Sequence, residues 1–172
     1  MDVCTLVWRT AQRYGGYEAV VHNESPLTFA QAWRRGVRLA DGLLAMGLKP
    51  GDRVGVLEDN SVEAADLFQA SAIANLARVP LYPRNGRSAY TRILAHTDCR
   101  VLLVSENHAY EVDELTEELV ALNRIFVRDG GYERWLADQS DADPHVSVHL
   151  NDYLIIRHTG GTIGLSKGVA HT

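Results

Sequence analysis

The residues best suited to chemistry lie in one glycine-rich segment, residues 157–169 (RHTGGTIGLSKGV), directly after the apolar run 153–156. Glycines let backbone amides approach phosphate oxygens closely, and threonine and serine hydroxyls donate further hydrogen bonds. The lysine adds a compact positive charge that pairs with a phosphate group. The segment therefore predicts a loop that binds a polyphosphate.

The residue order differs from that of a Walker A loop, and a structural explanation also fits the segment. A Walker A loop ends on Gly-Lys-Ser/Thr and runs into a helix, whereas here Lys167 follows Ser166 and precedes Gly168. Glycine and threonine are also ordinary turn residues, so a glycine-rich hairpin turn at a sheet edge has the same composition. Taken alone, the segment leaves both interpretations open.

Other polar groups are better explained by structural roles, and we expect no metal site. His145 and His149 have the spacing of two ligands on a helix, but they follow a proline in a segment that looks extended. The two cysteines are far apart in the sequence and are expected to be reduced thiols. A group of acidic residues falls in an expected helix and predicts a solvated face: Glu111, Asp113, Glu114, Glu117 and Glu118.

Composition excludes several classes of protein. The chain has 172 residues, 17 Lys and Arg against 22 Asp and Glu, and a net charge of −5, with no basic block for nucleic acid. No apolar run approaches the ~18 residues of a membrane helix, and no signal peptide is evident, so we expect a cytoplasmic protein without a transmembrane segment.

Short β-branched runs alternate with longer segments of helical periodicity, which predicts an α/β fold with a largely parallel sheet and helices on both faces. The expected strands cover residues 19–22, 53–57, 79–82, 100–104, 124–127 and 153–156. The clearest helix begins after Thr28, which forms a capping-box spacing with Gln31, and it ends before Gly47. A second helix follows Ser61, and shorter helices are expected at residues 88–96, 108–122 and 132–139.

The glycine-rich segment resembles the phosphate-binding loop of the adenylate-forming (acyl-CoA synthetase, AMP-binding) enzymes, whose usual form is YTSGTTGxPKGV. The resemblance continues upstream in the family's order through residues 27–31 (LTFAQ), 48–57 (LKPGDRVGVL), 79–84 (VPLYPR) and 100–104 (RVLLV). Several motifs in the right order are more specific than one loop. Among these enzymes, the chain most resembles the fatty-acid-CoA ligases.

The resemblance implies a two-step reaction with ATP, Mg²⁺ and coenzyme A. A carboxylic acid, most often a fatty acid, attacks the α-phosphorus of ATP to give an acyl-adenylate and pyrophosphate, and coenzyme A then takes the acyl group. The resemblance implies no catalytic and no metal-binding residue within this chain. It implies a nucleotide-binding role for Thr159, Gly160, Gly161, Thr162, Ile163, Gly164 and Lys167.

The loop departs from the family's pattern at four positions. Gly160 replaces a frequent serine, Ile163 replaces a threonine, Ser166 replaces the proline, and His158 replaces the tyrosine. These changes remove hydroxyl groups and a rigid proline, so we expect nucleotide binding that is weaker than in the family but not absent.

The resemblance also implies that residues 1–172 form the N-terminal part of the large adenylation domain and end just after the phosphate-binding loop (157–169), without the small C-terminal domain. Such a fragment is expected to be inactive alone and to self-associate through exposed core surface. Three alternatives remain open: a fatty acyl-AMP ligase, a peptide-synthetase adenylation domain, and a truncated non-catalytic nucleotide-binding or interaction module.

Overall fold

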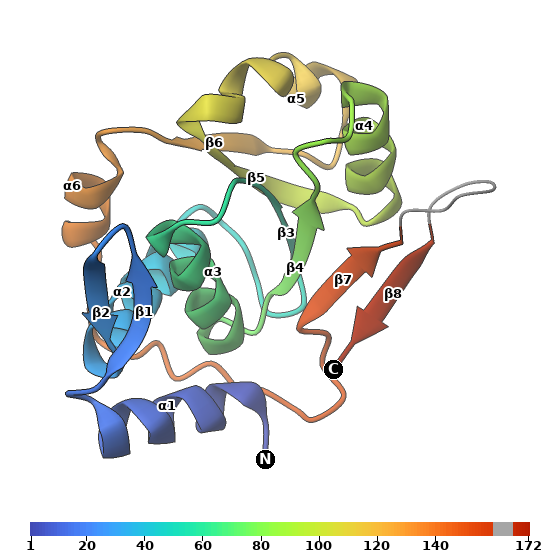
Figure 1. Ribbon diagram of the computed structural model, residues 1–172. Helices are drawn as coiled ribbons and strands as arrows, with labels where there is room; N and C mark the ends of the chain where they lie inside the picture. Colours follow the sequence, from blue (N-terminus) through green and yellow to red (C-terminus); the bar gives the residue numbers. More distant parts are fainter. Residues whose placement is uncertain (160–166) are drawn as a thin grey trace.

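The computed structural model describes residues 1–159 and 167–172 and contains an open, mainly parallel sheet with helices on both faces (Figure 1). The strand order is β6-β5-β3-β4-β7-β8, and every neighbouring pair is parallel except β7 and β8. The predicted fold class is confirmed. The strands of this sheet are β3 (Arg53–Leu57), β4 (Ala77–Leu81), β5 (Cys99–Ser105), β6 (Arg124–Arg128), β7 (Ile155–His158) and β8 (Gly168–His171).

The helices divide between the two faces. Helices α2 (Phe29–Ala45), α3 (Val62–Ile73) and α6 (Tyr132–Ala137) pack on one face, which we call the α3 face. Helix α4 (Arg87–His96), the 3-10 helix η1 (Glu106–Glu111) and α5 (Leu115–Glu118) cover the opposite face. Helix α1 (Val3–Tyr14) contacts α2 and α3, and the hairpin of β1 (Glu18–His22) and β2 (Ser25–Thr28) also lies beside α2.

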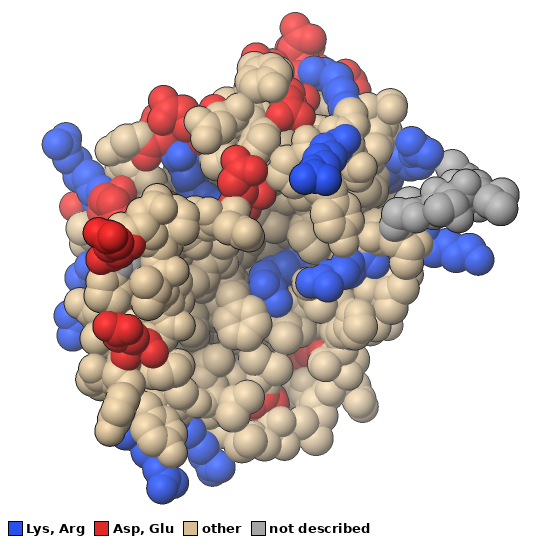
Figure 2. Space-filling view, viewed as in Figure 1, with Lys and Arg blue, Asp and Glu red and all other residues tan. Residues whose placement is uncertain are grey.

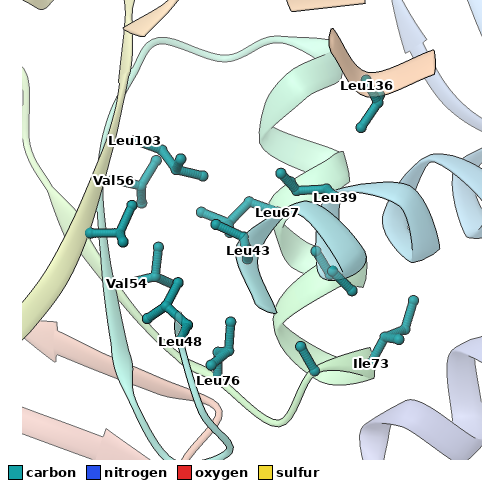
Figure 3. Packing of buried hydrophobic residues seen from close by; sticks show 14 of the residues in the cluster. Leu39, Leu43, Leu48, Val54, Val56, Leu67, Ile73, Leu76, Leu103 and Leu136 are labelled. Carbon is teal, nitrogen blue, oxygen red and sulfur yellow. The ribbon is translucent and has the colours of Figure 1, made fainter. Parts of the chain in front are cut away.

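Alternation along the strands sends apolar side chains to both faces. On the α3 face, leucines of α2 and α3 pack against the valines of β3 (Figure 3). On the other face, Tyr90 and Leu94 of α4 pack against Leu102 and Val104 of β5. Gly55 permits this approach, because a Cβ atom there would lie 2.7 Å from Leu94 Cδ2. Full burial of such side chains contributes roughly 1.5–3 kcal/mol each.

The predicted ends of α2 and the predicted start of α3 are confirmed. The Thr28 hydroxyl accepts a hydrogen bond from the Gln31 amide at 3.3 Å, and the Gln31 side chain accepts one from the Thr28 amide at 2.8 Å. Gly47 follows α2 with a φ of 93°, a conformation that glycine adopts without strain. Ser61 caps α3 through the amide of Ala64 at 3.2 Å.

Three expectations about the elements need correction. The single helix expected at residues 108–122 is instead η1 and the short α5, because Glu114 adopts a left-handed φ of 67° between them. Helix α1 and strands β2 and β8 were not expected. The last predicted strand, 153–156, is observed as β7 at Ile155–His158, so it extends to the first residues of the glycine-rich segment.

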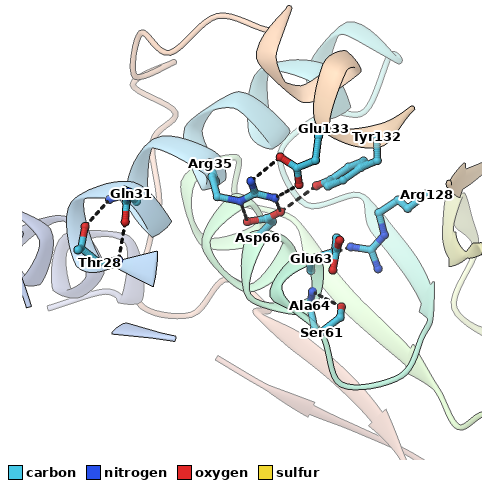
Figure 4. Close-up of polar contacts among 10 residues, drawn as sticks. All are labelled: Thr28, Gln31, Arg35, Ser61, Glu63, Ala64, Asp66, Arg128, Tyr132 and Glu133. Atoms are coloured by element: carbon cyan, nitrogen blue, oxygen red, sulfur yellow. Dashed lines mark hydrogen bonds and ion pairs between the residues drawn. The ribbon is translucent and has the colours of Figure 1, made fainter. Parts of the chain in front are cut away.

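A buried polar network joins the helices of the α3 face (Figure 4). Arg35 of α2 donates two hydrogen bonds of 2.7 Å to Asp66 of α3, whose side chain is 1% exposed. The same guanidinium bonds Glu133 at 2.6 and 2.7 Å, and the Tyr132 hydroxyl donates to Asp66 at 3.1 Å. The bidentate geometry satisfies a carboxylate that would otherwise be costly to bury.

Replacing Asp66 by Asn is expected to lower the free energy of unfolding by about 3–5 kcal/mol, because the partly buried Arg35 loses the buried one of its two carboxylate partners. Glu133→Gln is the matched control on the same guanidinium. The Glu133 side chain is 63% exposed, and its loss should cost less than about 1 kcal/mol. Urea unfolding of the three proteins measures both values, and equal losses would contradict the buried role of Asp66.

Candidate nucleotide-binding site

The glycine-rich segment begins at the carboxyl edge of the parallel sheet. Strand β7 runs parallel to β4, with Ile155 opposite Arg78, so it ends at the same edge as the other parallel strands. In open α/β sheets, ligands bind at this edge, in the loops that follow the strands. The location therefore agrees with a binding role for the segment.

Strands β7 and β8 hold the two ends of the segment together. They pair antiparallel, with Arg157 opposite Val169 and His158 opposite Gly168. Beyond this ladder, the Thr159 amide donates to the Lys167 carbonyl at 3.0 Å, and the Lys167 amide donates to the Thr159 hydroxyl at 3.4 Å. The chain thus leaves and re-enters the sheet at one point.

Of the predicted nucleotide-binding residues, the structure places Thr159 and Lys167 side by side, and both are exposed. The other five lie outside the described residues: Gly160, Gly161, Thr162, Ile163 and Gly164. The flanking strands form a hairpin at the edge of the sheet, as the structural interpretation expected. The paired strands β7 and β8 only fix where the segment starts and ends, so they are compatible with a phosphate-binding loop between them.

The hydroxyl of Thr159 and the ammonium of Lys167 suit a polyphosphate. A hydroxyl donates a hydrogen bond to a phosphate oxygen, and an exposed lysine adds a charge-assisted one. The sequence pointed to both residues through their types alone. Their mutual contact depends on the β7–β8 pairing, which the expected strand at 153–156 did not include.

His158, the second residue of the segment and the last of β7, is almost fully buried, at 3% exposure. Its ring meets that of His96 of α4 edge to face, with centroids 6.0 Å apart. Neither ring nitrogen has a hydrogen-bond partner among the described residues. Burial lowers the pKa of His158, and His96 lowers it further, so the neutral imidazole is favoured.

The remaining candidates take part in ordinary structural contacts. Glu111 bonds the His108 ring at 2.6 Å and the Tyr90 hydroxyl at 3.0 Å, and Glu118 pairs with Arg87 at 2.7 Å. Within residues 1–159 and 167–172, no three His, Cys, Asp or Glu side chains are grouped as metal ligands would be.

Both cysteines are free thiols, as predicted. Burial raises the pKa of Cys99 to about 12 and that of Cys4 to about 11, so both remain protonated at neutral pH. The described part of the chain also contains no helix long and apolar enough to cross a membrane.

The fold and the position of the segment define an α/β protein with a candidate nucleotide site at the carboxyl edge of its sheet. The model of the AMP-binding enzyme family matches residues 7–172, so the chain belongs to that family. The family expected from the sequence motifs is confirmed.

Curated relatives of several kinds are similar to the chain. Feruloyl-CoA synthase of Amycolatopsis sp is 35% identical over 154 residues, which is 90% of this chain and 30% of that protein. Long-chain-fatty-acid--CoA ligase FadD13 of Mycobacterium tuberculosis is 32% identical over 85% of the chain. A linear gramicidin synthase of Brevibacillus parabrevis is 30% identical over 88% of the chain and 2% of that protein. The chain spans 30% and 29% of the lengths of the first two proteins.

Solved structures agree with this assignment. The inhibitor-bound N-terminal domain of FACL13 from Mycobacterium tuberculosis superimposes with a TM-score of 0.92 at 26% identity, covering 99% of this chain and 44% of that one. The anthranilate CoA ligase AuaEII shares the fold, with a TM-score of 0.91 at 21% identity over 99% of this chain and 34% of that one.

The buried neutral His158 predicts a pH dependence of stability. Because its folded pKa is lowered from 6.5, the unfolded chain binds more protons in the window between the folded pKa and about pH 6.5. The free energy of unfolding should therefore fall as the pH falls through that window. In His158→Phe this contribution should disappear.

Urea unfolding between about pH 7.5 and 5 compares the two proteins at each pH. His145→Asn is the matched control, because the His145 side chain is 87% exposed. A wild-type protein and a His158→Phe variant with the same pH slope would contradict the prediction.

Proposed function

We propose that residues 1–172 are the N-terminal part of the large adenylation domain of an AMP-forming acid–thiol ligase. In this proposal, that part ends just after the phosphate-binding loop (157–169). The supporting observation is the contact between Thr159 and Lys167 at the carboxyl edge, which closes the glycine-rich segment at its base. Membership in the AMP-binding family supports the same assignment. The whole ligase would convert a carboxylic acid and ATP into an acyl-adenylate and pyrophosphate, and the thiol of coenzyme A would then take the acyl group and release AMP.

In this proposal, the segment binds the phosphates of ATP and stabilises the departing pyrophosphate. Negative charge develops on the leaving group, so preorganised donors at this position lower the barrier. Thr159 and Thr162 would donate hydroxyl hydrogen bonds, Gly160, Gly161, Ile163 and Gly164 would present backbone amides, and Lys167 would supply the positive charge. Mg²⁺, when bound with ATP, neutralises further phosphate charge.

The substrate we propose is a fatty acid, with coenzyme A as the thiol acceptor. FadD13, named a long-chain-fatty-acid--CoA ligase, supports this choice. The relatives also include a feruloyl-CoA synthase and a gramicidin synthase, so membership in the family does not by itself select the acyl group. We propose a cytoplasmic location for the ligase, where both ATP and coenzyme A are available.

A carrier protein is a second candidate acceptor. The Fatty acid--[acyl-carrier-protein] ligase ScoC of Streptomyces coeruleorubidus is 31% identical over 96% of the chain. Both acceptors require the same first step, so the phosphate-binding segment has the same role in either case. Replacing coenzyme A by a carrier protein in the second step distinguishes the two.

Lys167→Ala in the whole ligase is expected to reduce fatty-acid-dependent exchange between ATP and pyrophosphate by about 10²–10³-fold, because one preorganised donor is lost. Lys49, the other lysine of the chain, provides the matched control. It lies before β3 at the amino edge of the sheet, so Lys49→Ala should leave exchange unchanged. Equal exchange in both variants, or none in the wild-type ligase with any fatty acid, would overturn the proposal.

A further inference from the structure

Two arginines on neighbouring strands, β4 and β7, lie close together on the α3 face of the sheet. Arg78 of β4 is opposite Ile155 of β7, and Arg157 lies two residues further along β7. Because side chains alternate along a strand, Ile155 and Arg157 project to the same face of the sheet. Arg78 is paired with Ile155 and projects to that face as well, so Arg78 and Arg157 share it. Figure 2 shows basic side chains gathered over β4 and β7 at the margin of a hollow.

The surroundings of Arg78 leave its charge uncompensated. Its guanidinium lies over the ring of Phe68 of α3, with Cζ 4.8 Å from the centroid, and its Nε atom is buried without a hydrogen-bond partner. Burial and the like charge of Arg157 together lower the pKa of Arg78 to about 10. No carboxylate of the described residues forms an ion pair with either arginine.

Two other arginines that the fold largely encloses have carboxylate partners. Arg35 is paired with Asp66 and Glu133, and Arg128 is paired with Glu58. An arginine that is half-buried beside a second arginine lacks such compensation, and a bound anion would supply it. The planar guanidinium fork matches phosphate oxygens in a bidentate manner.

We propose that Arg78 and Arg157 form an anion subsite for a phosphate group, next to the predicted nucleotide-binding residues 159–167 and distinct from them. Arg157 lies on β7, two residues before Thr159, so the subsite adjoins the edge at which nucleotide binding is proposed. This inference rests on the proposed function for the source of the phosphate, which is ATP or coenzyme A. Two guanidinium groups suit a dianionic phosphate better than a single carboxylate.

Pyrophosphate titration of the ¹⁵N-labelled chain tests the subsite by observing the arginine Nε–H signals. The Nε–H signals of Arg78 and Arg157 are expected to shift and those of Arg124, an exposed residue of β6, to stay in place. Arg157→Gln should weaken pyrophosphate binding about 10-fold or more, because charge-assisted hydrogen bonds are lost. Arg124→Gln is the matched control and should not change it. Arg157 is exposed, so its replacement should leave the fold intact.

Separate titrations with ATP and with coenzyme A identify the source of the phosphate, because only the correct ligand should shift the Arg78 and Arg157 signals in the micromolar to millimolar range. Acetate serves as the carboxylate comparison. An equal response to acetate, or no shift with pyrophosphate, would overturn the subsite.

Lys167→Ala separates this inference from the proposed function. If pyrophosphate still shifts the Arg78 signal in Lys167→Ala, the subsite is independent of Lys167. If Lys167→Ala abolishes pyrophosphate binding while Arg157→Gln leaves it unchanged, the subsite is wrong and the phosphate-binding loop stands. If Arg157→Gln abolishes it and Lys167→Ala does not, the subsite stands and the assigned role of Lys167 is wrong.

Discussion

The parallel alignment of β7 with β4 is the constraint on which the candidate site depends. The Arg78 amide donates to the Leu154 carbonyl at 3.0 Å, and the Leu154 amide donates to the His171 carbonyl at 2.8 Å. These bonds order three strands at one edge of the sheet. They set which residues of β7 face α3, which face α4, and where the glycine-rich segment leaves the sheet.

This alignment is supported from a distance by the long segment that precedes β7. The Asn75 side chain donates to the Ser147 carbonyl at 3.0 Å and to the Asp152 carboxylate at 2.7 Å. Asp152 also accepts the His149 amide at 2.9 Å, and these hydrogen bonds lower the pKa of Asp152. The turn that follows α3 therefore anchors the chain that returns from α6 to the sheet.

Helix α3 connects stability with the site. Its buried side chains fill the core beneath β3, its Asp66 holds α2 and α6, and its Phe68 covers Arg78. The same helix thus stabilises the domain and shapes the hollow beside β7.

Local sequence signals predicted most of the sheet and the helix caps, because alternation, capping residues and glycines act within a few residues. They missed β2, whose Pro26 is unusual in a strand, and they joined η1 and α5, because no local signal marks the left-handed Glu114. The partner of Asp66 is 31 residues away, so spacing within α3 could not reveal it. For the site, residue types indicated Thr159 and Lys167, whereas the pairing of Arg78 with Arg157 required the strand order.

The most direct test of the account is the response of the backbone amides of this chain to ATP, measured by NMR with each amide assigned. The account predicts shifts at Thr159 and Lys167 and along the segment between them, with the amino edge of the sheet around Lys49 unchanged. Amides at Thr159 and Lys167 that do not respond at millimolar ATP, or shifts confined to another part of the chain, would contradict a phosphate site at the end of β7.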